Sequence, residues 1–181
     1  MTLIVEHTPL EGLVLVRPKI YADHRGHFYE SFNESTWQKE GLPSHFVQEN
    51  RSFSVKNTVR GLHFQVPPHG QGKLVQVLHG RALDVVVDIR KNSPSFGKSY
   101  SILLSHEEIV QMYVPLGFAH GFYAIEDTIF NYKCTSFYEP SAERSIQWND
   151  PDLNIEWGIE HPILSPKDFK GINFNDFISP F

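Results

Sequence analysis

The residues best suited to chemistry lie in one otherwise apolar stretch, RGLHFQVPPHGQGKLV, which runs from Arg60 to Val75. Arg60, His63 and Lys73 are cationic or titratable, and strand positions that face a core rarely hold such side chains. A histidine beside cations has its neutral form favoured, and the neutral ring is the state that accepts a proton. The stretch therefore indicates proton transfer, with His63 as a general base.

The neighbours of His63 strengthen this interpretation. Because side chains alternate along a strand, His63 and Gln65 face away from Leu62 and Phe64. One face then gathers a histidine, an amide and, near the strand ends, the two cations. A lone histidine in a core is more often hydrogen-bonded to backbone, but His63 has other polar side chains beside it, which favours a functional role. As a base it also needs a carboxylate that orients its ring.

A second stretch, VPLGFAHGF, contains the pattern P-x-G-x-x-H ending at His120, which is similar to the second motif of cupins. In metal-binding cupins the first motif supplies H-x-H and a Glu, whereas here Gln65 follows His63 at the second histidine position. Ala124 stands where an Asn usually follows. A mononuclear centre typically needs at least three protein ligands, so the pattern favours a cupin-like barrel over a metal site.

Tyr132, in the stretch NYKCTSFY, is a candidate proton donor. Alternation places Tyr132 and Cys134 on one face of a strand and Lys133 on the other. The phenol of Tyr132 either belongs to a core aromatic with a bonded hydroxyl or lines a pocket, where it could donate a proton.

Two further polar stretches are candidates for ligand binding. In DHRGHFYESF, Arg25 lies at a turn into a strand that places Phe28 and Glu30 on one face, although a turn arginine can simply be solvated. The stretch QENRS, residues 48–52, could supply amides to a ligand.

The elements that must position these residues are mostly strands. Strand-like runs separated by Gly, Pro, Asn and Asp are expected at residues 12–18, 27–32, 73–80, 82–90, 99–105, 110–115, 121–126 and 128–138. Short helices are expected at 33–41 and 165–169, the latter with Ser165 as its N-cap. Many short strands with few helices indicate an all-β sandwich or jelly roll with a pocket lined by inward-facing side chains.

Bulk properties restrict the classes of protein. The 181 residues suit a single domain, residues 1–181, and 40% of them are hydrophobic, enough for a substantial core. The net charge of −5 argues against nucleic acid as the main partner. One cysteine fits a reducing compartment. The first residues do not resemble a signal peptide, and no apolar run is long enough for a bilayer, so we expect a soluble, cytoplasmic protein without a membrane partner.

Taken together, the motifs resemble those of the dTDP-4-dehydrorhamnose 3,5-epimerase family, the RmlC-type sugar-nucleotide epimerases. The matching stretches cover most of the chain in the order of the family: DHRGHFYESF, VQENRS, VRGLHFQ, QGKLVQVLHG, DVVVDIRKNSPSFG, VPLGFAHGF, YKCTSFY, IQWNDPDLNIEW and LSPKD. The resemblance implies an all-β, cupin-like jelly-roll barrel with a few short peripheral helices. It also implies a homodimer and a nucleotide-sugar substrate, with no metal and no cofactor.

The resemblance further implies residue roles. His63 matches the catalytic base, Asp168 the carboxylate that pairs with it, Tyr132 the acid on the opposite face, and Lys73 the cation near the ketone oxygen. Tyr138 matches an aromatic residue that stacks on thymine, and some of the substrate contacts are implied to cross the dimer interface. The implied substrate-binding set is Arg25, Phe28, Glu30, Gln48, Glu49, Asn50, Arg60, Lys73, His120, Tyr138, Glu143 and Lys167.

The implied reaction converts dTDP-4-keto-6-deoxy-D-glucose to dTDP-4-keto-L-rhamnose through an enolate. The alternatives are a 3- or 5-mono-epimerase, a 3,4-ketoisomerase, the same chemistry on a CDP, UDP or GDP sugar, a non-catalytic binder and a metal-dependent oxygenase. The presence of both His63 and Tyr132 favours epimerisation, and Gln65 argues against the oxygenase. Tyr138 could stack on any base, so it does not discriminate between nucleotides.

Overall fold

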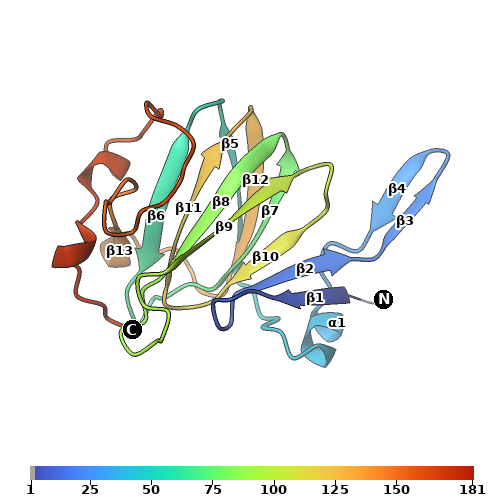
Figure 1. The fold of residues 1–181 in the computed structure, drawn as a ribbon. Coiled ribbons are helices and arrows are strands. Elements are labelled where there is room, and N and C mark those ends of the chain that lie inside the picture. The colour runs from blue at the N-terminus through green and yellow to red at the C-terminus, as the bar shows by residue number, and fades with distance from the viewer. Residues whose placement is uncertain (1–2) are drawn as a thin grey trace.

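Two antiparallel sheets lie face to face in the computed structural model, which describes residues 3–181 (Figure 1). One sheet has the order β1 (Leu3–His7), β2 (Val14–Pro18), β10 (Gln111–Val114), β7 (Lys73–His79), β12 (Thr128–Cys134) and β5 (Gln48–Ser54). The other has the order β13 (Glu143–Ser145), β6 (Val59–Gln65), β11 (Phe118–Ala124), β8 (Arg81–Asp88) and β9 (Ser99–Ser105). Helices are short: α1 (Glu34–Lys39) and three 3₁₀ turns, η1 (Pro140–Ala142), η2 (Asp168–Lys170) and η3 (Phe174–Asp176). The all-β jelly roll expected from the sequence is confirmed.

The main core fills the space between the two sheets. Inward positions of β7 and β12 supply Val75, Val77 and Phe130, and β11 contributes Phe122 from the facing sheet. The Phe122 and Phe130 rings stack with centroids 4.2 Å apart and an interplanar angle of 5°. This apolar packing fixes the spacing of the sheets, so polar side chains further along the same strands are held in defined positions.

The C-terminal segment covers the outer face of the five-stranded sheet (Figure 1). Phe64 projects outward from β6 and packs edge-on against Phe177, with ring centroids 5.5 Å apart, and against Phe181. The Phe-rich end of the sequence therefore packs on its own barrel, and it carries η2 to the back of strand β6.

A bulge interrupts the pairing of β6 with β11. His63 pairs with His120, but the next register pair is Arg60 with Phe122, so two residues of β6 oppose Gly121. A Cβ on Gly121 would lie 2.6 Å from the Arg60 carbonyl oxygen, closer than real Cβ atoms approach. The bulge therefore depends on a glycine at this position.

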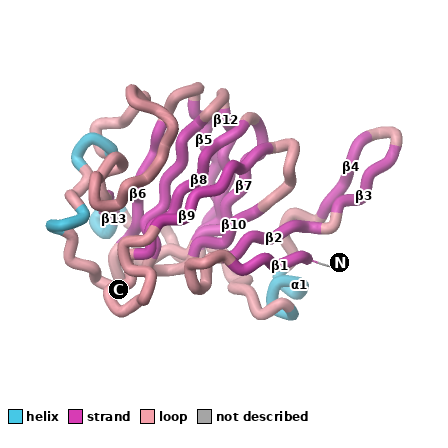
Figure 2. The backbone as a smooth tube through the Cα atoms, viewed as in Figure 1, coloured by secondary structure: helices cyan, strands magenta, loops and turns pink. Residues whose placement is uncertain are grey.

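The hairpin of β3 (Ile20–Asp23) and β4 (Gly26–Tyr29) projects away from both sheets (Figure 1; Figure 2). Every residue of β3 is exposed, and so is Phe28 of β4. The hydroxyl of Tyr29 accepts a hydrogen bond from Gln76 on β7, which ties the base of the hairpin to the barrel.

Several element boundaries differ from the sequence expectation. The strand beginning at Thr128 ends at Cys134 rather than at residue 138, and the strand at 121–126 begins earlier, at Phe118. Helix α1 has Asn33 as its N-cap, as expected. Instead of a helix over 165–169 capped by Ser165, the structure has the 3₁₀ turn η2 at Asp168–Lys170, and Ser165 lies before it with its hydroxyl donating to the Asp168 carboxylate. No helix within residues 3–181 is long and apolar enough to cross a membrane.

Candidate active site

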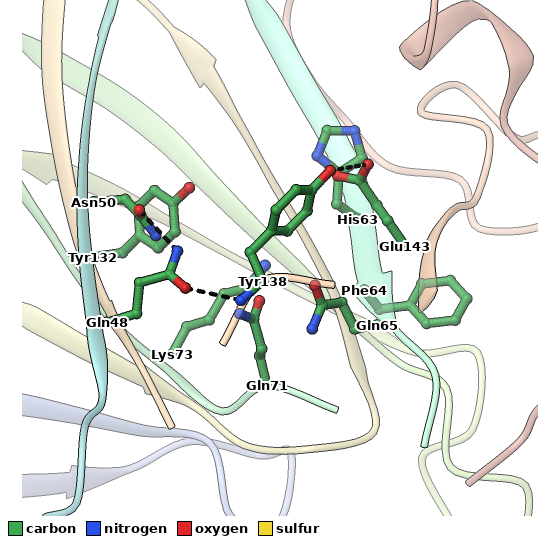
Figure 3. Close-up of a pocket in the computed structure, with 10 residues that line it drawn as sticks. All are labelled: Gln48, Asn50, His63, Phe64, Gln65, Gln71, Lys73, Tyr132, Tyr138 and Glu143. Atoms are coloured by element: carbon green, nitrogen blue, oxygen red, sulfur yellow. Dashed lines mark hydrogen bonds between the residues drawn. The ribbon is translucent and has the colours of Figure 1, made fainter. Parts of the chain in front are cut away.

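A polar cavity of about 300 Å³ opens between the two sheets at one end of the barrel (Figure 3). A deeper cavity of about 170 Å³ adjoins it, and both are lined by His63, Lys73 and Tyr132. The outer cavity is completed by Gln48, Asn50, Phe64, Gln65, Gln71, Tyr138 and Glu143. The inner cavity is completed by Ser52, Arg60, His120, Gly121, Phe122 and Phe130.

His63 is oriented by a buried carboxylate. Its Nε2 lies 2.8 Å from Oδ1 of Asp168, whose side chain is only 2% exposed. Burial by itself would raise the pKa of the Asp168 carboxyl, but hydrogen bonds from His63, Ser165 and the Gly61 amide outweigh it and lower that pKa to about 2. Asp168 is therefore ionised at neutral pH, and Nδ1 of His63 is the ring nitrogen left to accept a proton from a ligand.

Tyr132 approaches the cavity from the other sheet, on β12. Burial raises the pKa of its phenol, so the hydroxyl keeps its proton throughout the neutral range. Cys134 lies on the same face of the strand and is buried, whereas Lys133 faces outward and pairs with Glu49. The alternation expected from the sequence is confirmed, and it gives the cavity a proton donor opposite the histidine.

Lys73 brings a cation to the boundary between the two cavities. Burial lowers the pKa of its amine, while the nearby Cys134, Asp84 and Glu143 act in the opposite direction. Within residues 3–181 no carboxylate forms an ion pair with Lys73. Its amine is thus available to an electronegative atom of a ligand.

Arg60 and His120 also line the inner cavity. The Arg60 side chain is held by Ser54 Oγ at 2.9 Å and by the Phe53 carbonyl at 3.2 Å. His120 lies across from His63, and its Nε2 is 3.0 Å from both oxygens of the buried Asp84. With His63 and Lys73, four basic side chains from three strands therefore surround this cavity, which suits a ligand that carries negative charge.

The rim of the outer cavity is built by Tyr138, Glu143 and Lys167. The Tyr138 hydroxyl donates to Glu143 at 2.9 Å (Figure 3). Lys167 forms an ion pair with the same carboxylate. Gln48 accepts a hydrogen bond from the Tyr138 amide at 2.8 Å and its own amide donates to Asn50. These contacts place an aromatic ring over the mouth of the cavity.

Five residues of the expected binding set do not line either cavity in this chain: Lys167, which lies at the rim, and Arg25, Phe28, Glu30 and Glu49. Glu49 faces outward because Gln48 and Asn50 take the inward positions of β5, and it pairs with Lys133 at 2.9 Å. Arg25 pairs with Asp23 on the projecting hairpin, and Phe28 beside it is 62% exposed. Glu30 follows the hairpin and accepts a hydrogen bond from Asn33.

Sequence reasoning missed several residues of this site. Asp84 holds His120, and its signal was a carboxylate inside the nearly continuous apolar run LDVVVDI. Gln65 was expected on the cavity face, but its contacts were not: it donates to the His69 and Phe137 carbonyls and accepts from the Glu139 amide, which organises the rim. Ser52 has a buried hydroxyl without a hydrogen-bond partner in the described part of the chain. Among residues 3–181 there is no group of three or more His, Cys, Asp or Glu side chains that could hold a metal ion.

Comparisons with known proteins agree with this geometry. The family profile described as dTDP-4-dehydrorhamnose 3,5-epimerase matches residues 7–176. The enzyme of that name from Methanothermobacter thermautotrophicus is 47% identical over 165 residues, covering 89% of each chain. The Legionella pneumophila dTDP-6-deoxy-D-glucose-3,5-epimerase, solved in complex with dTDP-4-keto-L-rhamnose, superposes with a TM-score of 0.92 at 43% identity and covers 98% of this chain and 95% of its own. A 3′-monoepimerase from Streptomyces bikiniensis, solved with dTDP-quinovose, has a TM-score of 0.86 at 33% identity, covering 93% and 86%.

Proposed function

This chain belongs to the dTDP-4-dehydrorhamnose 3,5-epimerase family, and from that premise we propose how its cavity works as an isomerase. It inverts C3 and C5 of dTDP-4-keto-6-deoxy-D-glucose to give dTDP-4-keto-L-rhamnose, within the route to dTDP-L-rhamnose. The observation that carries the proposal is the placement of His63 and Tyr132 on facing sheets around one cavity. A base and an acid on opposite sides of a sugar ring are what inversion of a carbon requires.

Proton removal begins at His63. The C4 ketone of the sugar acidifies the neighbouring C–H bonds, and Nδ1 of His63 accepts the proton while the bonding electrons move to O4 as an enolate. Asp168 stabilises the imidazolium that results. Lys73 lies against O4 and balances its negative charge, in a site where burial strengthens such an interaction.

Reprotonation comes from the opposite side. The Tyr132 hydroxyl delivers its proton to the carbon, the electrons return from the enolate, and the configuration at that carbon is reversed. His63 and Tyr132 then exchange protons with water, and the second carbon reacts in the same way. The substrate's own ketone is the electron sink for both steps.

The remaining contacts hold the nucleotide. Arg60 and His120 bind the diphosphate and sugar from the inner cavity, while Tyr138 stacks on the base. Gln48, Asn50, Glu143 and Lys167 complete the nucleotide-sugar contacts at the outer cavity and rim.

We propose a homodimer in which the projecting hairpin completes the site of the partner. Ile20, Tyr21 and Phe28 are exposed on this hairpin, and an isolated two-stranded hairpin has little stability of its own. Strand β5, at the edge of its sheet and beside the cavity, is paired on one side only, by β12. Arg25, Phe28 and Glu30 then reach the partner's substrate, and Glu49 lies at the interface.

Mixing two inactive variants tests this arrangement. Arg25→Ala damages the hairpin and leaves the barrel intact, whereas His63→Ala removes the base and leaves the hairpin intact. If hairpins are exchanged, a heterodimer has one complete site, and an equimolar, re-equilibrated mixture recovers about a quarter of wild-type activity. A mixture as inactive as its components contradicts hairpin exchange.

The reaction itself is tested by NMR in D2O with dTDP-4-keto-6-deoxy-D-glucose. Deuterium at both C3 and C5 of the product is the expected result. Deuterium at one carbon contradicts double epimerisation and indicates a mono-epimerase. No incorporation, despite binding of the nucleotide sugar, indicates a non-catalytic binder.

A further inference from the structure

The Asp168 carboxylate is held by three hydrogen-bond donors besides the His63 ring. The Ser165 hydroxyl donates to Oδ2 at 2.5 Å, and the Ser165 backbone N–H reaches the same oxygen at 3.1 Å. The Gly61 N–H donates to Oδ1 at 3.2 Å, the oxygen that also contacts His63. Donors from β6 and from the turn before η2 therefore converge on one carboxylate.

These donors lie on the outer side of β6 rather than in the cavity, with Ser165 exposed and Asp168 buried. Asp168 is 2% exposed, and Ser165 lines neither of the two cavities assigned to the substrate. The Ser165 side chain thus does not touch the substrate in the proposed function, and any effect of it on the reaction passes through Asp168 and His63.

We propose that Ser165 is a positioning residue for the epimerisation: its hydroxyl takes up part of the Asp168 charge and thereby sets how strongly His63 holds a proton. The proposal rests on His63 being the base in the proposed function. Gly61 acts in the same way through its backbone, but a backbone donor cannot be removed without disturbing the bulge.

The direction of the effect follows from competition for one negative charge. Without the Ser165 hydroxyl, the carboxylate loses its shortest hydrogen bond and more of its charge acts on the His63 ring. A stronger negative field favours the imidazolium over the neutral ring. Because the neutral ring is the base, Ser165→Ala moves the acidic limb of the kcat/KM profile to higher pH.

Other charged groups face this pair and are the same in every variant compared. Around His63 they come from β6, β7, β11, β12, β13, η2 and the rim: Arg60, Lys73, His120, Tyr132, Glu143, Arg144, Tyr138, Lys167 and Lys170. Around Asp168 on the outer side they are Glu160 and His161. A difference in pH profile between variants at Ser165 is therefore caused by the Ser165 hydroxyl itself.

The test compares kcat/KM against pH for wild type, Ser165→Ala and Ser165→Thr. Ser165→Ala is expected to shift the acidic limb upward by roughly half to one pH unit with KM nearly unchanged, and Ser165→Thr to restore it. The matched control is Ser95→Ala, which removes a hydroxyl that donates to the buried Asp88 at 2.6 Å, away from His63. Ser95→Ala is expected to lower the free energy of unfolding and to leave the acidic limb of the kcat/KM profile at its wild-type pH.

A direct titration separates this role from the assignment of the reaction. The His63 ring can be followed by NMR in the absence of substrate, and its pKa is expected to rise in Ser165→Ala. Should that variant fold poorly, Ser165→Cys keeps the shape with a weaker donor, and the same upward direction is expected. An unmoved or lowered His63 pKa in a folded variant overturns the proposal, whatever the enzyme's activity.

Discussion

The His63 imidazole and the Tyr132 phenol belong to different sheets and line the same two cavities. Neither side chain is hydrogen-bonded to the other: His63 is held by Asp168, and Tyr132 has its pKa raised by burial. A ligand between them meets a proton acceptor on one side and a proton donor on the other. This separation makes the two halves of the reaction experimentally distinguishable.

Replacing each member of this pair gives a different exchange pattern in D2O. His63→Ala is expected to lose both hydrogen–deuterium exchange at the sugar carbons and inversion of those carbons. Tyr132→Phe is expected to keep slow exchange on the face of the sugar next to His63 but to lose inversion. Each loss of turnover is expected to be about 10²–10⁴-fold, because each variant lacks one proton-transfer group. NMR of substrate and product measures both quantities. Equal loss of exchange in the two variants contradicts the assigned roles.

Lys73→Met tests the cation at the enolate oxygen. The substitution keeps an unbranched side chain but removes the charge, so kcat is expected to fall about 10²–10³-fold, with a smaller change in KM. Lys39→Met, in the last turn of helix α1, is the control and should retain wild-type kinetics. A loss confined to KM would place Lys73 in substrate binding alone.

The alkaline side of the pH profile provides a second test of Lys73. Burial lowers the pKa of this amine below its ordinary value of 10.5, so its charge is lost as pH rises through the lowered value. As pH rises, the activity of wild type is therefore expected to begin to fall before pH 10.5 is reached. The residual activity of Lys73→Met should lack this fall. The decline persisting in Lys73→Met would assign it to another group.

Acid sensitivity is expected from Asp88 as well as from Asp168. Burial alone would raise the Asp88 pKa, but hydrogen bonds from Arg90, Ser93 and Ser95 lower it to about 2, below the ordinary value of 3.8. A carboxyl whose pKa is lower in the folded state stabilises the fold above the unfolded value, and this stabilisation is lost as pH falls from about 3.8 to about 2.

Denaturation by urea at several pH values measures this effect. Asp88→Asn is expected to be less stable than wild type at neutral pH by on the order of 2 kcal/mol, and to lose less stability on acidification. The exposed Asp176→Asn is the control, with wild-type behaviour expected. Parallel stability curves for Asp88→Asn and wild type would contradict the prediction.

Gly121→Ala tests the bulge that brings Arg60 and His63 to one cavity. The new methyl group would lie 2.6 Å from the Arg60 carbonyl and 3.0 Å from Gly61 Cα, so the strands must move apart. We expect a loss of about 2 kcal/mol or more in the free energy of unfolding, together with most of the activity. Gly158→Ala, at positive φ but in open space, should cost about 1 kcal/mol and leave kcat unchanged.

The sequence predicted well what depends on local periodicity. The run NYKC alternates, and the structure places Tyr132 and Cys134 inward with Lys133 outward. His63 and Gln65 likewise share the cavity face of β6, while the side chains of Leu62 and Phe64 pack in the outer core, although Phe64 also borders the outer cavity. Successive side chains in these runs face either an apolar core or a polar environment, so the period of two is visible in the sequence.

Periodicity failed where both faces of a strand are polar. Strand β5 has no apolar alternation, because Gln48 and Asn50 line the cavity while Glu49 and Arg51 face outward. Arg60 lines the same cavity as His63, as expected, but not through periodicity. It lies three residues before His63, which simple alternation places on the opposite face, and the bulge at Gly61 returns it to the same cavity.

Contacts between distant segments were beyond any local pattern. The pairing of His63 with Asp168 spans 105 residues, and in the sequence it came from family resemblance rather than from the residues themselves. The same limit applies to the hairpin of β3 and β4. The hairpin is exposed because the chain leaves the sheet at the end of β2. The residues within the hairpin do not predict that direction.

The route of the C-terminal segment also has a consequence for the order in which the protein matures. All the strands described here precede residue 146, whereas the carboxylate hydrogen-bonded to His63 is Asp168. A ribosome synthesising the chain from its N-terminus therefore completes every strand of both sheets before it adds the partner of His63. A nascent barrel in that condition has a cavity without the His63–Asp168 pair, so under the proposed mechanism the ability to abstract a proton is among the last properties the polypeptide acquires.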